Sequence, residues 1–170
     1  MSTQVSNDKA TSASNDTTIP FRLEVVVIPI ADFDRAKAFY GSRLGWRVDA
    51  EADSGTGYRL MQVTPPGSNA SVIFGTQVTA APAGSSDGLL LTVDNVDTAR
   101  DELVSRGVEV SEAFHDAAGT LGGGFHIGDE GRAAGPDPER RSYATYASFN
   151  DPEGNRWILQ EITERLPGRV

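Results

Sequence analysis

The sequence contains no cysteine, which excludes disulfides, zinc–thiolate sites, iron–sulfur clusters and thiol catalysis. A cysteine-free chain is compatible with a reducing compartment, and we expect a cytoplasmic protein. No apolar run approaches the roughly 18–20 residues that a membrane-spanning helix needs. Residues 1–20 lack the apolar stretch of a secretory signal and are rich in Ser, Thr, Asn and Asp. We therefore predict a disordered tail at residues 1–20 and no export. The alternative for this segment is an arm that becomes ordered on a partner subunit.

Positive charge is also scarce. Fifteen Lys and Arg residues face 24 Asp and Glu residues, which gives a formal net charge of −9. A surface this acidic repels phosphate backbones and anionic lipids, so neither nucleic acid nor a membrane is an expected partner. The sequence has no G-x-S-x-G nucleophile motif and no dinucleotide-binding glycine fingerprint after a strand. Hydrolase and dehydrogenase functions therefore have no support, and no cofactor is indicated.

What is present is a chain of 170 residues, 38% of them hydrophobic, which is enough for one domain with a real core. Its predicted elements follow the same order twice. The first half has a strand at 23–30, a helix within 31–46, and strands near 47–50, 58–64 and 71–75. The second half has a strand at 88–93, a helix at 98–107, and strands at 108–114, 143–149 and 157–162.

This order is a duplicated βαβββ unit. A constant offset of 63 residues aligns Asp34 with Asp97 and Ala36 with Ala99. The alternative is chance similarity between two amphipathic helices. We predict an α+β fold in one domain, residues 21–166, with modules at about 21–80 and 86–166. The two modules would form a curled mixed sheet around a cleft, with the helices outside. Such a cleft is the default place for a small ligand.

Two motifs carry a family resemblance. The segments IPIADFDRAKAFY and DPEGNRWILQE resemble the vicinal-oxygen-chelate superfamily of glyoxalases, extradiol dioxygenases, fosfomycin-resistance enzymes and bleomycin-resistance proteins. The resemblance covers residues 21–166 and implies the two-module fold. Its members carry many unrelated chemistries, so it indicates function only broadly. It also implies a homodimer.

The metal enzymes of this superfamily take His or Glu ligands from the first and last strands of their modules. The corresponding positions here are Val25, Gly88 and Ile158, whose side chains cannot bind a divalent ion. A one-residue shift would bring in Glu24 and Glu161, but neighbouring strand residues face opposite sides of a sheet. The resemblance therefore implies a metal-free cleft.

Other residues could still act on a ligand. The only histidines, His115 and His126, lie in or beside a long glycine-rich stretch. Long loops in compact domains are often functional, and an imidazole titrates near working pH, so His126 is the candidate general base. Both histidines, together with Asp116, Asp129 or Glu130, could alternatively form a non-standard metal site.

The remaining candidates are a polar anchor, a charged group and aromatic side chains able to stack on a flat ligand. The full set of predicted ligand-binding residues is His115, His126, Gln160, Tyr58, Phe74, Tyr143, Tyr146 and Arg156. Arg140 or Arg141 could bind a ligand carboxylate, although an ion pair within the protein is the more common role. Trp157 is assigned to the core, because it alternates with the cleft-facing residues of its strand.

Three functions remain open. The first is a metal-free protein of the glyoxalase and bleomycin-resistance type that binds a natural product or xenobiotic. The second is an enzyme of the same fold that uses His126 for proton transfer, isomerisation or ring opening. The third is a metal-dependent lyase or dioxygenase with non-standard ligands. A small-molecule ligand is common to all three.

Overall fold

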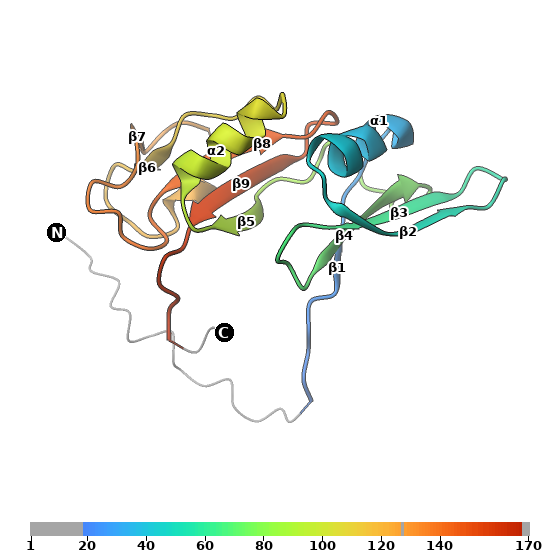
Figure 1. The fold of residues 1–170 in the computed structure, drawn as a ribbon, viewed down its shortest axis with the longest axis horizontal. Coiled ribbons are helices and arrows are strands. Elements are labelled where there is room, and N and C mark those ends of the chain that lie inside the picture. The colour runs from blue at the N-terminus through green and yellow to red at the C-terminus, as the bar shows by residue number, and fades with distance from the viewer. Residues whose placement is uncertain (1–18, 127, 168–170) are drawn as a thin grey trace.

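The computed structural model describes residues 19–126 and 128–167, so most of the predicted tail lies outside the described residues. The first half forms a four-stranded sheet in the order β1-β4-β3-β2 (Figure 1). The second half forms a five-stranded sheet in the order β5-β9-β8-β6-β7. β1 pairs with β4 in parallel, and β5 pairs with β9 in parallel, while the other neighbours are antiparallel. The first four strands of the second sheet, β5-β9-β8-β6, occupy the places that β1-β4-β3-β2 occupy in the first sheet. The α+β class and the βαβββ duplication are therefore confirmed.

The first module follows the predicted order. Its strands are β1 (Val25–Val27), β2 (Arg47–Asp53), β3 (Arg59–Thr64) and β4 (Ser71–Thr76). Its helix begins as α1 (Phe33–Lys37) and continues as a π-helical turn, η2 (Ala38–Arg43). The second module contains β5 (Leu89–Val93), α2 (Val96–Ser105), β6 (Phe114–Asp116), η3 (Gly123–Phe125), β7 (Arg132–Ala134), β8 (Tyr146–Asn150) and β9 (Arg156–Glu161).

The two helices start in the same way. The Asp32 side chain accepts a hydrogen bond from the Arg35 amide, and the Asn95 side chain accepts one from the Thr98 amide. Such caps satisfy backbone donors that the first helical turn leaves unpaired. Asp32 and Asn95 are 63 residues apart, so the caps obey the predicted offset.

Several predicted strands differ from the observed ones. The predicted strand at 108–114 begins only at Phe114, preceded by a single bridge between Val110 and Phe149. The Ser111 hydroxyl accepts the amide hydrogen of Ser148, which interrupts the backbone ladder there. The predicted strand at 143–149 begins at Tyr146, because Tyr143 has a φ of 71°, outside the range of strands. β7 and η3 were not predicted.

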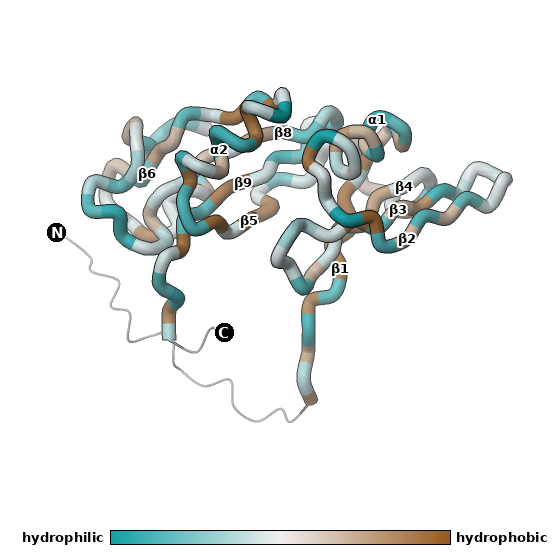
Figure 2. Tube along the Cα trace, viewed as in Figure 1, coloured by the Kyte–Doolittle hydropathy of each residue, from teal (hydrophilic) through white to brown (hydrophobic). Residues whose placement is uncertain are grey.

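One hydrophobic core spans both modules. Trp46 of the first module packs edge-on against Trp157 of the second, with ring centroids 5.3 Å apart. Trp157 is almost fully buried, which confirms its predicted core role. Figure 2 shows hydrophobic residues on β1 and β5, the end strands of the two sheets. In the described part of the chain, no helix is both long and apolar enough to span a bilayer.

Candidate functional site

The second sheet carries a second apolar surface on the face turned away from α2. We call it the far face. Its buried cluster consists of Phe114, Tyr146 and Ile158, which is separate from the main core. Strand register pairs Tyr146 with Gln160 and with Phe114, so these side chains share one face. The Phe114 and Tyr146 rings are stacked, with centroids 5.7 Å apart.

A small polar network marks one end of the far face. The Tyr146 hydroxyl donates to the Tyr143 carbonyl at 2.5 Å and accepts from the Gly122 amide at 2.8 Å. The Gln160 side-chain amide donates to the same Tyr143 carbonyl at 3.1 Å. Burial raises the pKa of Tyr146, with the Gly122 hydrogen bond opposing the rise, so the phenol stays protonated at neutral pH. The face therefore combines an aromatic wall with neutral hydrogen-bonding groups.

The glycine-rich stretch lies against this face. A Cβ added to Gly124 would stand 2.3 Å from the Tyr146 ring, so the backbone rests on the ring itself. A Cβ added to Gly123 would stand 2.4 Å from the Asp116 Cβ. Next along the chain, the Phe125 ring lies beside Gly88 on the approach to β5. Residues 122–125 thus cross from β8 towards β5.

His126 and Asp116 meet at the edge of this stretch. His126 Nε2 lies 3.5 Å from Asp116 Oδ1, with the imidazole half-exposed and the carboxylate buried. Burial alone would raise the pKa of Asp116, but hydrogen bonds from Thr120 and from the Ala118 amide outweigh it and hold the pKa below its usual value. An ionised carboxylate beside an imidazole can orient the ring for proton transfer.

The other histidine takes a structural position. His115 Nδ1 lies 2.8 Å from the Gly135 carbonyl, on the opposite side of β6 from Phe114 and Asp116. Asp129 forms an ion pair with Arg132. In the described residues no group of three or more His, Cys, Asp or Glu side chains is arranged to hold a metal ion, so the alternative metal set is not brought together.

The three positions that correspond to family metal ligands are occupied by apolar residues and a glycine. Ile158 is fully buried beside Tyr146 and Phe114, and Val25 is half-buried on the edge strand β1. Gly88 has a φ of +80° and lies against the Phe125 ring. These residues offer a divalent ion no side-chain donor, so they do not fit a metal of the family type. Glu161, the one-residue alternative, lies on the helix side of β9, where it accepts the Val96 amide at 3.0 Å.

The predicted aromatic ligand contacts divide between the modules. Phe74 is fully buried in the main core, where it packs against Phe33 and Tyr40, and it does not belong to the far-face cluster. Its strand neighbours Ile73 and Gly75 lie on the other face of β4. Alternation separates the two sets of residues, but it does not show which set faces the core. Tyr58 lies at the end of the β2–β3 hairpin, which extends away from the second sheet (Figure 1).

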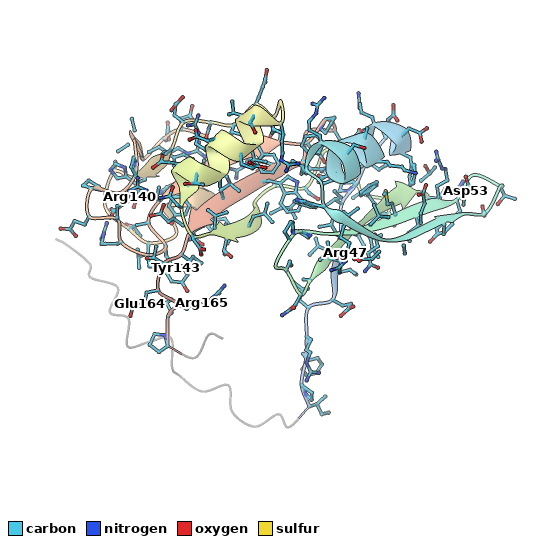
Figure 3. All side chains as sticks on the ribbon, viewed as in Figure 1. Arg47, Asp53, Arg140, Tyr143, Glu164 and Arg165 are labelled. Carbon is cyan, nitrogen blue, oxygen red and sulfur yellow. The ribbon has the colours of Figure 1, made fainter. Side chains whose placement is uncertain are left out.

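The charged candidates are engaged in ion pairs. Arg156 pairs with Asp87, and Arg141 pairs with the buried Asp137 at 2.7 Å. Arg140 binds both Asp97 and the buried Glu161. Arg140 and Tyr143 lie on the second sheet's side of the molecule, whereas Arg47 and Asp53 lie on the first sheet's side (Figure 3). Arg140, Arg141 and Arg156 therefore each already have a protein carboxylate as partner.

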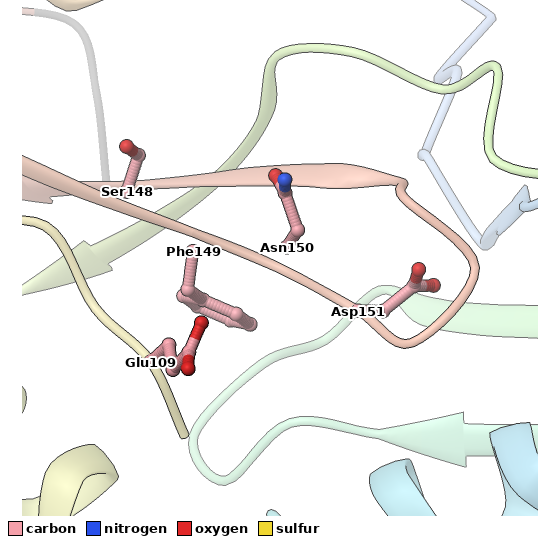
Figure 4. Close-up of a pocket in the computed structure, with 5 residues that line it drawn as sticks. All are labelled: Glu109, Ser148, Phe149, Asn150 and Asp151. Carbon is pink, nitrogen blue, oxygen red and sulfur yellow. The ribbon is translucent and has the colours of Figure 1, made fainter.

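A hollow of about 300 Å³ lies at the end of β8 (Figure 4). Its lining residues are Glu109, Ser148, Phe149, Asn150 and Asp151. None of the predicted ligand-binding residues belongs to it.

Two residues of the far face, Phe114 and Gly124, were not predicted from the sequence. The stacking of Phe114 on Tyr146 depends on the register of β6 with β8. The contact of Gly124 with Tyr146 depends on the path of the glycine-rich loop back across the sheet.

The family model described as Glyoxalase/Bleomycin resistance protein/Dioxygenase superfamily matches residues 22–159. The chain belongs to this superfamily. The family predicted from the two motifs is thereby confirmed. None of the curated proteins compared with this superfamily member matches it significantly.

Solved structures of the superfamily resemble this member along most of its length. TnmS3, described as an antibiotic binding protein from Streptomyces sp. CB03234, is 27% identical with a TM-score of 0.61. The match covers 86% of this chain and 98% of TnmS3. A glyoxalase/bleomycin resistance protein from the same strain is 28% identical with a TM-score of 0.58, covering 82% of this chain and all of the other. A superfamily member from Sphaerobacter thermophilus DSM 20745, 20% identical with a TM-score of 0.59 over 84% and 98% of the two chains, shares the fold.

Proposed function

We propose that this superfamily member binds a small organic molecule, a natural product or xenobiotic, on the far face of its second sheet. The observation that carries the proposal is the far face itself, a stacked aromatic pair beside Ile158 and Gln160 that lies outside the main core. Ligand sites are typically apolar walls with a few fixed polar groups, and this face has that character. The resemblance to TnmS3, described as an antibiotic binding protein, supports the same ligand class.

We propose further that binding needs no metal. The side chains at Val25, Gly88 and Ile158 provide no donor, and hard or borderline divalent ions need carboxylate or imidazole ligands. Recognition would then depend on stacking against the aromatic pair and on hydrogen bonds near Gln160 and Tyr146.

Isothermal titration tests both statements. Bleomycin and a panel of planar aromatic antibiotics are titrated into the protein with and without EDTA. At least one compound is expected to bind, and EDTA is expected to leave its affinity unchanged. Gln160→Met should weaken that binding, whereas Gln62→Met on β3 serves as the matched control and should not. Binding that disappears with EDTA and returns with a divalent ion would overturn the metal-free proposal.

We also propose a homodimer. Phe21 is 85% exposed and Leu23 is 69% exposed, and both precede the edge strand β1, where Val27 is 41% exposed. Large apolar side chains gathered at a sheet edge favour burial against another chain, and a second copy is the partner that the family resemblance implies. Analytical ultracentrifugation should give a dimer, and a Phe21→Ser, Leu23→Ser double variant should shift the equilibrium towards monomer. A wild-type protein that sediments as a monomer at micromolar concentration would contradict this.

A second candidate is an enzyme of the same fold, a lyase or isomerase that uses His126. The observation in its favour is the 3.5 Å approach of His126 to the ionised Asp116 beside the far face. His126→Ala separates the two candidates once a ligand is identified. Unchanged binding and no conversion by either protein favours the binding protein, while conversion that the variant loses favours the enzyme.

A further inference from the structure

The path of the glycine-rich stretch across the far face has a definite start and end. The Gly122 amide donates to the Tyr146 hydroxyl on β8, and Phe125 lies beside Gly88, next to β5. Strand β9 lies between β8 and β5 in the sheet. The chain must therefore pass over β9, whose Ile158 is fully buried. Residues 119–126 thus occupy the surface on which we propose that a ligand binds.

Two glycines make this close approach possible through their size. Neither Gly123 nor Gly124 has a positive φ, so their backbone conformation suits any residue. What each lacks is space, because an added Cβ would stand 2.4 Å from Asp116 or 2.3 Å from Tyr146. The peptide at Gly124 lies on the Tyr146 ring where a flat ligand ring would stack.

Polar contacts rather than apolar packing hold the stretch in place, and the Gly119 amide donates to the Asp116 carbonyl at 2.9 Å. These contacts also include the Gly122 hydrogen bond, the Thr120 amide bond to Asp116 at 2.7 Å and the longer His126–Asp116 contact. The Phe125 ring is 48% exposed and the His126 ring is about equally so. Segments with little buried apolar area are those that open locally, well below the free energy of global unfolding.

We propose that residues 119–126 are a lid that occupies the far face in the absence of ligand, and that a planar aromatic ligand binds by displacing the Gly124 peptide from the Tyr146 ring. This inference rests on the proposed function and adds both a regulation of the site and a ligand shape. The closed lid competes with the ligand, so the observed affinity depends on how readily the lid opens.

The absence of cysteine allows a direct test, since one introduced thiol reports on one position. Ile158 and Leu159 are adjacent on β9 and both buried, Ile158 in the far-face cluster with Tyr146 and Leu159 in the main core. Ile158→Cys and Leu159→Cys are each labelled with Ellman's reagent under native conditions, with and without Gly124→Ala. The added methyl group cannot fit against the ring and should hold the lid open. We expect Gly124→Ala to accelerate labelling at position 158 on the order of tenfold or more, and to leave position 159 unchanged.

Equal acceleration at both positions would mean global unfolding, and no acceleration at either would mean that the stretch does not control access. Either result overturns the lid. Gly41→Ala is the control, since its added Cβ meets only ordinary contacts at 3.8 Å and should change neither rate. Should Gly124→Ala fail to fold by circular dichroism, Phe125→Ala removes the contact beside Gly88 without adding an atom and should accelerate labelling at position 158 alone. The assay uses no ligand, so its failure leaves the titration of antibiotics as a separate test of binding.

Discussion

The buried hydroxyl of Tyr40 donates a 2.6 Å hydrogen bond to Asp151, joining the helix of the first module to a turn of the second. Trp157 donates its indole N–H to the same Tyr40 oxygen at 2.9 Å. Burial raises the pKa of Tyr40, and the Asp151 carboxylate raises it further, so the phenol stays protonated at neutral pH.

Tyr40→Phe should therefore destabilise the protein by about 1.5–3 kcal/mol, because it removes a buried hydrogen bond to a carboxylate. It also leaves the Trp157 indole without its acceptor. Urea unfolding followed by tryptophan fluorescence measures the loss. Tyr58→Phe at the hairpin is the control, with an expected change close to zero. A Tyr40→Phe variant as stable as its parent would mean that the link contributes nothing to stability.

The buried carboxyl group of Asp137 should make the stability of the protein depend on pH. Hydrogen bonds from the Arg141 side chain lower its pKa to about 2, against the opposing effect of burial. A carboxyl group with a lowered pKa stabilises the fold above its unfolded pKa, and this contribution is lost as the pH falls towards the folded value. Asp137→Asn should cost about 1–2 kcal/mol at pH 7. The difference from the parent protein should shrink between about pH 4 and pH 2. Chemical unfolding of both proteins across this range is the measurement, and a pH-independent difference would exclude the mechanism.

Glu153 holds the start of the first helix. Its buried carboxylate accepts hydrogen bonds from the Ala31 and Asp32 amides at 3.0 and 3.1 Å and from the Arg35 side chain at 3.0 Å. Glu153→Gln replaces one acceptor oxygen by a donor facing these N–H groups. The expected loss is about 1–3 kcal/mol by urea unfolding. The same substitution at Glu112, whose side chain is 89% exposed, should change stability by less than about 0.5 kcal/mol.

His126 should matter little for stability. Its imidazole is 47% exposed and its contact with Asp116 is long, and exposed ion pairs contribute about 0–1 kcal/mol. The free energy of unfolding of His126→Ala should thus lie within about 0.5 kcal/mol of that of the parent protein. Asp116→Ala should cost about 1–3 kcal/mol, because it removes an ionised carboxylate that accepts hydrogen bonds from the Ala118 and Thr120 amides. A large loss in His126→Ala would make that variant unsuitable for testing catalysis.

Local patterns in the sequence predicted the modules well. The 63-residue offset predicted from Asp34 and Asp97 also relates the observed helix caps, Asp32 and Asn95, because capping involves only neighbouring residues. Alternation likewise separated Trp157 from Ile158 and Gln160, and the observed register agrees.

Tertiary contacts account for what the sequence did not predict. Alternation cannot tell which face of β4 meets the core, so the burial of Phe74 against Phe33 and Tyr40 was not predictable from its strand alone. The strand expected at 108–114 is shortened by a serine hydroxyl that replaces a backbone acceptor, which is invisible in residue propensities. The close contact of Gly124 with the Tyr146 ring is between residues that no hydrophobic periodicity or sequence motif relates.

The turn from Asp151 to Asn155 also has a consequence for the order in which the protein is made. Tyr40 meets its carboxylate partner 111 residues further along the chain, and the Ala31 amide meets its acceptor 122 residues further along. The Asn155 side chain also donates to the Pro29 carbonyl. While these late residues are still inside the ribosome, the first half has emerged without the groups that complete its helix start. We therefore expect nascent chains to resist protease only after translation has passed the final strand.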